Sequence, residues 1–280
     1  MGVPFVIPPK SLFLALLGKN PPVLFDVRRG DIIASSKHLI PGAIIADQGD
    51  GPALMGGLDR SRDIVVACAH GHNRSQRMAA HLRSAGFRAS TVENGYDGWS
   101  EAGLPFVALE ARGVTLGGKP TIWVTRRRPK IDRVACPWLI SRFLDPRARF
   151  LFTDPEWVLE VAETEAGIAY DLPGGLFEHD GPLCSFDILL EAFGLAHFAP
   201  LALLARIIRG ADTDDLGIAP QAAGLLAVSL GLSVRHGDDD HGLLADGFKI
   251  YDGLLAWAMH AASERHDWPR TAGATLKAGS

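Results

Sequence analysis

One short segment constrains the fold of this chain more than any other: an apolar strand that runs through a cysteine into a helix. Ile64–Ala67 is apolar and mostly β-branched, which is typical of a strand buried on both faces. Residues 75–85 then carry apolar side chains at helical spacing, and Gly86 is a natural helix stop. Cys68 therefore lies between a strand end and a helix N-terminus, where loop amides and the helix dipole favour an anionic sulfur. This arrangement predicts a nucleophilic cysteine in preference to an inert core cysteine.

Length, charge and cysteine content limit the class of protein. The chain has 280 residues and a formal net charge of −4, so it has no overall attraction for nucleic acid or for anionic membranes. The apolar run at residues 13–17 is too short to span a bilayer. The three cysteines, at positions 68, 136 and 184, form no CxxC motif and no complete disulfide set, which suits a reducing compartment. We expect a cytoplasmic protein without a membrane partner.

Changes of pattern along the chain predict two domains. Residues 1–109 alternate short apolar runs with helical segments, which indicates an α/β domain with a parallel sheet and helices on both faces. Residues 110–120 are rich in glycine and lack periodicity, so they are the expected linker. Residues 121–268 begin with a small sheet and then become mostly helical, which predicts an α-rich α+β domain. Its expected helices include one over about residues 131–144 and one over about residues 243–260. Residues 269–280 are small and polar, and we expect a disordered tail.

The loop after Cys68 supplies the candidate catalytic and anion-binding groups of the first domain. Its backbone amides are expected to bind an anion at the start of the helix. Cys68 is the predicted nucleophile, and Arg74 is predicted to assist as a bidentate oxyanion ligand; the alternative is an exposed arginine on the first helical turn. The residues that complete the predicted binding loop are Ala69, His70, Gly71, His72, Asn73 and Ser75.

Two histidines of this loop have more than one interpretation. His70 and His72 suit a role in stabilising a thiolate or protonating a leaving group, or they are surface residues. A Cys-x-His-x-His cluster is also a metal-ligand pattern, but a short loop at a helix N-terminus repels cations. Asp26 and Arg28 are expected to form a structural ion pair beside the site rather than to act in catalysis.

The second domain contains more polar residues than a purely structural helical domain needs. Histidine, cysteine and aspartate side chains together suit a metal or an oxyanion site. The alternative is a buried network of aspartates and arginines, with His179 in a loop and Cys184 as a small core residue. The chain has no closely spaced set of metal ligands here, so no metal site is assigned. His179 is the candidate ligand if a metal binds, and no cofactor is required. The candidate polar site consists of Asp132, Arg133, His179, Cys184, Asp187, Asp212 and Asp214.

One basic run and one histidine-rich run need a separate interpretation. Residues 126–130 contain three consecutive arginines and a lysine, but Pro129 breaks any recognition helix through them. A nucleic-acid partner is therefore not expected. Residues 236–241 resemble a metal cluster, but such a run is more often a solvated loop that caps the following helix.

Five motifs follow one another in residues 1–108: Phe25-Asp26-Val27-Arg28, Ile40-Pro41-Gly42-Ala43-Ile44, the Cys68 loop, Glu93-Asn94-Gly95-Tyr96-Asp97-Gly98-Trp99 and Gly103-Leu104-Pro105. Their order resembles the rhodanese-like sulfurtransferase domain. This resemblance implies that Cys68 carries a persulfide and passes sulfur from a small-molecule donor to a thiol acceptor.

The loop departs from the usual rhodanese pattern by one residue. Ordinary rhodaneses have four residues between the cysteine and the arginine, whereas five separate Cys68 from Arg74 here. The longer spacing is similar to that of cysteine-dependent phosphatases, whose wider loop encloses a tetrahedral oxyanion. A thiol-dependent chromate or arsenate reductase, or a phosphatase-like enzyme, is therefore the alternative enzymatic hypothesis.

A second set of motifs runs through the second domain: residues 130–140 and 142–143, Phe177-Glu178-His179-Asp180-Gly181, Cys184-Ser185-Phe186-Asp187, residues 208–214, Ala219-Pro220, Ala223-Gly224-Leu225 and Tyr251-Asp252. With these motifs the domain resembles the C-terminal domain of the ChrB chromate-resistance family. This resemblance links the predicted sulfurtransferase to chromate resistance. It also leaves open a non-enzymatic alternative, in which the protein senses or binds chromate and Cys68 is dispensable.

Overall fold

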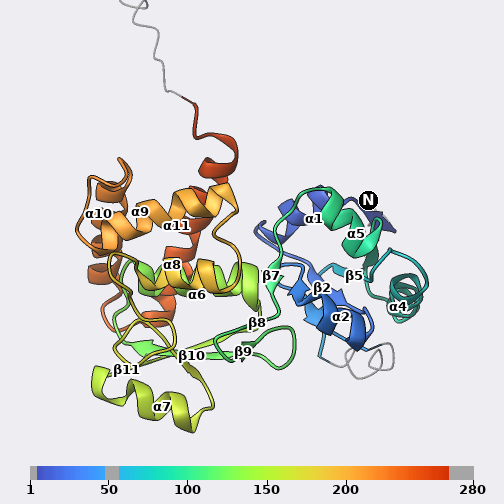
Figure 1. Cartoon of the computed structure of the whole chain (residues 1–280), viewed down its shortest axis with the longest axis horizontal. Helices are drawn as coiled ribbons and strands as arrows, with labels where there is room; N and C mark the ends of the chain where they lie inside the picture. Colours follow the sequence, from blue (N-terminus) through green and yellow to red (C-terminus); the bar gives the residue numbers. More distant parts are fainter. Residues whose placement is uncertain (1–4, 48–56, 265–280) are drawn as a thin grey trace, which may run out of the picture.

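A five-stranded parallel sheet forms the centre of the first domain (Figure 1). The structure is a computed structural model that describes residues 5–47 and 57–264. In the sheet the strands follow the order β1-β6-β5-β2-β4, and every neighbouring pair is parallel. β5 is buried along its whole length, as its apolar sequence predicts. The strands are β1 (Val6–Ile7), β2 (Val23–Asp26), β4 (Ile44–Ile45), β5 (Ile64–Ala67) and β6 (Ala89–Val92).

Helices cover both faces of this sheet. Successive side chains of a strand point to opposite faces, so Val65 of β5 belongs to the core beneath α1 and α5, whereas Val66 packs with α4. This is the predicted α/β architecture. Helix α2 was not predicted, because Ile33 is its one buried residue and it has no apolar stripe. The helices are α1 (Pro9–Leu16), α2 (Gly30–Ser36), α4 (Asn73–Ser84) and α5 (Gly95–Glu101).

The second domain is α-rich around a small parallel sheet, also as predicted. β10 (Ile122–Arg126) lies between β11 (Arg149–Thr153) and β12 (Ile168–Ala169). One face packs against α7 (Val158–Thr164), which follows the short 3-10 turn Pro155–Trp157. A layer of longer helices covers the other face (Figure 1). These helices are α6 (Asp132–Leu139), α8 (Ser185–Ala192), α9 (Ala199–Asp212), α10 (Ala222–His236) and α11 (Asp240–His260).

The helix expected over residues 131–144 changes its winding after Leu139. Pro137 lies inside α6 and has no N–H to donate, so it interrupts the regular hydrogen-bond ladder. The following turn, Ile140–Leu144, is a π-helix. The sequence pattern therefore located the helical segment but not its change of geometry.

The segment between the domains is folded and packed. Residues 110–120 form an antiparallel hairpin of β8 (Glu110–Ala111) and β9 (Val114–Thr115), and Leu116 is buried after it. Just before the hairpin, β7 (Val107–Ala108) pairs with β3 (His38–Leu39) of the first domain. The interface between domains continues one hydrophobic core: the ring of Phe13 lies 5.7 Å from that of Phe198.

Two expectations concern the ends of the molecule and its relation to membranes. The tail predicted at residues 269–280 lies outside the described residues. Among the helices of the described ranges, none combines the length and the apolar character needed to cross a bilayer.

Candidate active site and a buried polar cluster

Cys68 directly follows β5 and lines a pocket of about 290 Å³. It is nearly buried, and its Sγ lies 3.1 Å from the Oγ of Ser75 in the first turn of α4. The same Oγ lies 3.1 Å from the carbonyl oxygen of His72. Ser75 has one hydroxyl proton, so it donates either to that carbonyl or to the sulfur of a Cys68 thiolate. Ser75 is therefore placed to stabilise the anionic form of Cys68.

The backbone of the cysteine loop is held by the start of α5. The amides of Tyr96 and Asp97 donate to the carbonyl oxygens of Cys68 and Ala69 at 2.9 and 3.0 Å. In contrast, the amides of residues 69–75 donate to no acceptor in the parts of the chain that the structure describes. Unpaired N–H groups at a helix N-terminus favour anions, so these amides are available to a bound anion, and the anion-binding role of the loop stays a prediction.

Most of the predicted loop residues line one pocket with Cys68. Gly71 and Ser75 do not line it: Gly71 packs against the turn before α5, and Ser75 lies beneath the sulfur. Sequence analysis did not assign binding roles to three further lining residues, which come from the segment after β2. The pocket is lined by Arg28, Arg29, Ile32, Cys68, Ala69, His70, His72, Asn73 and Arg74.

Arg74 lines the pocket, but its guanidinium is anchored at the side. Its Nε donates to the carbonyl oxygen of Val27 at 2.6 Å, and one terminal nitrogen lies 3.3 Å from the carboxylate of Asp47. These contacts hold Arg74 beside the end of β2. The aspartate also offsets part of the positive charge that Arg74 brings to the pocket.

Two other charged pairs frame the loop. Arg28 and Asp26 form the buried structural ion pair expected from the sequence, with 2.6 Å between guanidinium and carboxylate. The Arg28 guanidinium also stacks on the ring of Tyr96 at 3.8 Å. His70 is hydrogen-bonded through Nδ1 to the carboxylate of Asp97, and both side chains are exposed. His70 therefore lies at the rim of the pocket.

A second group of ionisable side chains meets in the second domain, where separate elements converge. Asp132 begins α6, Asp212 ends α9, Asp171 follows β12, and His179 lies in the segment before α8. His179 Nε2 lies 3.1 Å from Asp132 Oδ2, 3.0 Å from Asp171 Oδ1 and 3.5 Å from Asp212 Oδ2. Three carboxylates thus surround one imidazole nitrogen.

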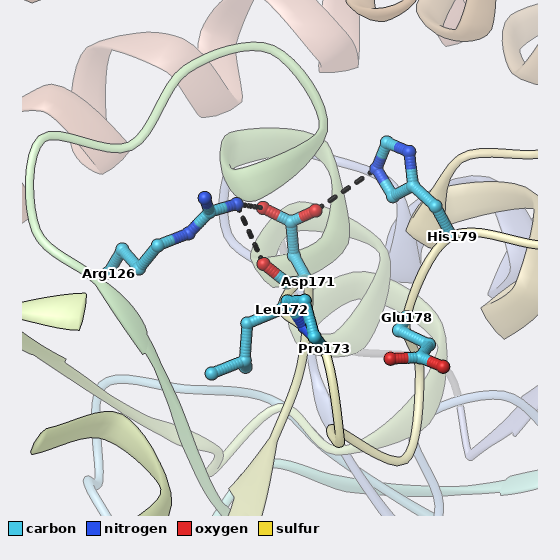
Figure 2. Close-up of a pocket in the computed structure, with 6 residues that line it drawn as sticks. All are labelled: Arg126, Asp171, Leu172, Pro173, Glu178 and His179. Carbon is cyan, nitrogen blue, oxygen red and sulfur yellow. Dashed lines mark hydrogen bonds and ion pairs between the residues drawn. The ribbon is translucent and has the colours of Figure 1, made fainter. Parts of the chain in front are cut away.

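Asp171 is the member of this cluster that sequence analysis missed. It accepts from Arg126 at 2.8 Å and from Arg133 at 3.1 Å, and it faces His179 on its other side (Figure 2). The signal for it was present but weak: an aspartate two residues after a strand, at the sheet edge where Arg126 also ends β10. A pocket of about 200 Å³ is lined by Arg126, Asp171 and His179, together with Leu172, Pro173 and Glu178.

Burial and crowding of like charges shift the pKa values of this cluster. Burial raises the pKa of Asp132 to about 8, although the hydrogen bond from His179 opposes the shift. Hydrogen bonds to Asp132 and Asp171 raise the pKa of His179 to about 10. Burial, with the charge of Asp171, raises the pKa of Asp212. Burial works against ionised Asp171, but hydrogen bonds from His179 and Arg126 outweigh it and lower its pKa.

The remaining predicted residues of the second domain lie apart from the cluster. Cys184 is the N-cap of α8, where its amide donates to Asp187 at 3.1 Å, and Asp187 also pairs with Arg209 at 3.2 Å. Asp214 is exposed beyond the end of α9. The structure therefore brings together Asp132, Arg133, His179 and Asp212 of the predicted set.

The loop at residues 236–241 has the capping role that its sequence favoured. The Asp239 side chain accepts from the amide of Gly242 at 2.9 Å and caps α11. His236, the last residue of α10, pairs with Asp246 of α11 at 3.0 Å.

The geometry of the first domain defines an α/β protein with a cysteine at the carboxyl end of a central parallel strand, followed by a loop whose amides have no acceptor among the described residues. Comparison with known families agrees with this fold, because a model of the rhodanese-like domain matches residues 10–102. A second model, described as ChrB, C-terminal domain, matches residues 123–258. The chain belongs to the rhodanese-like family and joins that domain to a ChrB C-terminal domain. Both resemblances found in the sequence are thereby confirmed.

Two curated relatives each match one part of the chain. Protein ChrB of Cupriavidus metallidurans is 39% identical over 144 residues, which cover 51% of this chain and 41% of that protein. The chain thus spans less than half of this relative's length. YtwF of Bacillus subtilis, provisionally named a sulfurtransferase, is 34% identical over 76 residues, which cover 27% of this chain and 71% of that protein.

Solved rhodanese-like structures are similar to the first domain. A rhodanese-like domain protein from Staphylococcus aureus is 26% identical, covers 35% of this chain and 91% of its own, and has a TM-score of 0.31. A rhodanese-related protein from Thermoplasma volcanium is 27% identical, covers 36% of this chain and 96% of its own, and has a TM-score of 0.32.

Proposed function

We propose that this protein is a sulfurtransferase that holds a sulfane sulfur on Cys68 as a persulfide, passes it to a thiol, and serves chromate resistance. The observation that carries the proposal is the cysteine loop: the Cys68 sulfur lines a pocket beside amides of residues 69–75 that have no acceptor in the described parts of the chain. Such amides would stabilise both the attacking thiolate and the terminal sulfur of a persulfide. The link to chromate resistance rests on the similarity of the second domain to ChrB.

Two steps complete the proposed reaction. The Cys68 thiolate attacks the outer sulfur of thiosulfate, the S–S bond of the donor breaks, and sulfite leaves with the electron pair while Cys68 becomes a persulfide. An acceptor thiolate then attacks the terminal sulfur, takes it as a new persulfide, and releases the Cys68 thiolate. Neither step requires a cofactor, and the partners are a small-molecule sulfur donor and a thiol.

The surroundings of Arg74 favour sulfur transfer over the oxyanion alternative. A tetrahedral dianion such as phosphate, arsenate or chromate is best bound by a guanidinium that turns both terminal nitrogens toward it. Here Asp47 and the carbonyl of Val27 engage Arg74 at the side of the pocket. The transfer of a single sulfur atom needs the loop amides and does not need that guanidinium.

Features of the second domain favour neither a chromate-sensing site nor a nucleic-acid site. Three carboxylates surround His179, and they would repel the chromate dianion. The arginines of the basic run each pair with an aspartate: Arg126 with Asp171, Arg127 with Asp154 and Arg128 with Asp238. These contacts support the proposal that the activity resides at Cys68, and we propose that the enzyme is cytoplasmic.

The test is the intact mass of the full chain after incubation with thiosulfate. We expect a gain of about 32 Da, one sulfur atom, on the wild type and none on Cys68→Ser. Cys184→Ser is the matched control: serine is a good N-cap, so this variant should fold and still gain sulfur. Ser75→Ala removes the hydroxyl beside the sulfur and should slow loading by about tenfold.

The outcomes separate the three hypotheses. Loss of the added sulfur on treatment with a small thiol, with the wild type regenerated, supports the complete transfer. Hydrolysis of p-nitrophenyl phosphate without any sulfur adduct would instead favour the phosphatase-like enzyme. A wild type whose free Cys68 takes up no sulfur, hydrolyses no ester and reduces neither chromate nor arsenate with an added thiol would overturn both enzymatic hypotheses.

A further inference from the structure

We propose that the second domain binds one first-row divalent metal ion between Asp132, His179 and Asp212. This metal site is separate from the Cys68 loop and goes beyond the proposed sulfur transfer. Its ligands come from the start of α6, the segment before α8 and the end of α9, so the folded domain brings them together.

The ligand atoms are already close enough for one ion. One oxygen of each carboxylate and one ring nitrogen of His179 lie within 4.8 Å of one another. When two ligand atoms each lie about 2.0–2.2 Å from the same ion, they are at most about 4.4 Å from each other. Small side-chain rotations would therefore seat an ion among Asp132, His179 and Asp212.

The His179 imidazole alone cannot satisfy the carboxylates around it, whereas a cation can. The Nε2 of His179 carries at most one proton, yet it faces oxygens of three carboxylates at 3.0–3.5 Å. Asp171 has two arginine partners of its own. Within residues 5–47 and 57–264, Asp132 and Asp212 pair with no arginine or lysine. A divalent ion between these two carboxylates would compensate the negative charges of both.

A second and independent observation points to a ligand at this place. Tyr170 precedes Asp171 and is completely buried, and its hydroxyl has no hydrogen-bond partner among the described residues. Burial raises the pKa of this hydroxyl, and the nearby Cys136, Asp171 and Asp132 raise it further. A buried hydroxyl without a partner is costly. A water molecule bound to a metal ion at the cluster would supply that partner.

The adjoining pocket gives the site access and room for further ligands. His179 and Asp171 line a pocket of about 200 Å³, and the His179 side chain is 41% exposed (Figure 2). A cation can therefore reach the cluster from solvent, with water completing its coordination. Arg126 and Arg133 hold Asp171 beside the proposed ion, where its carboxylate adds negative charge that favours a cation.

The donor set indicates the class of metal. Carboxylate oxygens with one imidazole nitrogen suit Mn²⁺, Co²⁺ or Zn²⁺, whereas Mg²⁺ and Ca²⁺ prefer oxygen ligands throughout. No thiolate joins the set, because the Cys184 sulfur is engaged with Asp187. The negative charge of the ligands excludes an oxyanion as the primary occupant.

Cobalt titration of the full chain tests the proposal. The Cys68→Ser variant serves as background, so that the loop thiol does not compete for metal. After treatment with a chelator, we expect one equivalent of Co²⁺ to bind, with visible absorption that Zn²⁺ abolishes. Asp212→Asn and His179→Gln should each weaken binding at least tenfold, while Asp214→Asn, an exposed neighbour, should leave it unchanged.

Two results would overturn the metal site. One is absence of stoichiometric Co²⁺ binding below millimolar concentration. The other is equal binding by the background protein, Asp212→Asn and His179→Gln, with folding verified by circular dichroism. If a variant fails to fold, Fe²⁺-catalysed oxidation of the unmodified protein decides the matter. Oxidation mapped by mass spectrometry should centre on His179, and damage centred on His70 and His72 would contradict the proposal.

Discussion

At the scale of single residues, Gly95 decides the shape of the cysteine loop. It adopts φ +57°, and a Cβ built on it would lie 2.1 Å from the carbonyl oxygen of Cys68 and 2.5 Å from the amide nitrogen of Gly71. The loop and the start of α5 can therefore approach only because this position has no side chain. The close approach also allows Tyr96 to hold the Cys68 carbonyl.

The first prediction is that Gly95→Ala disrupts the loop. Strained backbone and a clash with backbone atoms should together lower the free energy of unfolding by more than about 2 kcal/mol. Sulfur loading on Cys68 should fall at least tenfold. Gly103→Ala is the matched control: Gly103 has φ +66° but nothing within 4 Å of its Cβ position, so it should keep full loading. Urea unfolding and intact mass measure the two effects, and equal loading by both variants would contradict the prediction.

At the scale of elements, capping explains where the last long helix begins. The Asp239 side chain accepts from the Gly242 amide, one of the orphan donors at the N-terminus of α11. The helix expected from about residue 243 accordingly starts earlier, at Asp240. The apolar stripe shows only where a helix is buried, whereas the cap sets its first turn.

We expect Asp239→Ala to destabilise the protein by about 1 kcal/mol, because the α11 amide loses its acceptor. Asp239→Ser should recover most of this loss, since serine caps as well. Asp238→Ala, which removes the exposed partner of Arg128, should cause no measurable change. Urea midpoints of the purified variants provide the comparison; an unchanged midpoint for Asp239→Ala would show that the cap does not contribute.

At the scale of the whole molecule, the two domains share one hydrophobic core. Phe13 of α1 makes edge-to-face contacts with Trp99 of its own domain and with Phe198 of the other. Backbone bonds also cross between domains, from Gly42 to Phe143 at 2.8 Å and from Ala108 to the carbonyl oxygen of Phe193 at 3.0 Å. A continuous core couples the unfolding of the parts that it joins.

We therefore expect both domains to unfold in one transition. The buried Cys136 and Cys184 are natural probes of the second domain, and the buried strand β5 reports on the first through hydrogen exchange of its amides. Alkylation of these two thiols and exchange of the β5 amides in increasing urea, both read by peptide mass spectrometry, should give one midpoint. Phe198→Ala should lower that midpoint by weakening the interface. Clearly separate midpoints in the wild type would show that the domains unfold independently.

The sequence by itself determined the features that depend on neighbours along the chain. The apolar run at Ile64–Ala67 and the helical spacing after it located β5, the cysteine and α4, because strand and helix periodicities are local properties. The motifs around Cys68 also identified the rhodanese-like domain, which the family comparison confirmed. The π-helix after Pro137 was missed, since its geometry depends on how one proline disturbs a packed helix.

Only the tertiary structure decided which distant polar residues meet. Asp132, His179 and Asp212 were candidates, but only a weak pattern pointed to Asp171, and none separated Asp187 and Asp214 from them. Their grouping depends on the packing of segments that are distant in sequence. Where these segments meet, burial and the neighbouring carboxylates together raise the pKa of Asp132. The same holds for Arg74, whose direction is set by contacts with Val27 and Asp47, far from it in sequence.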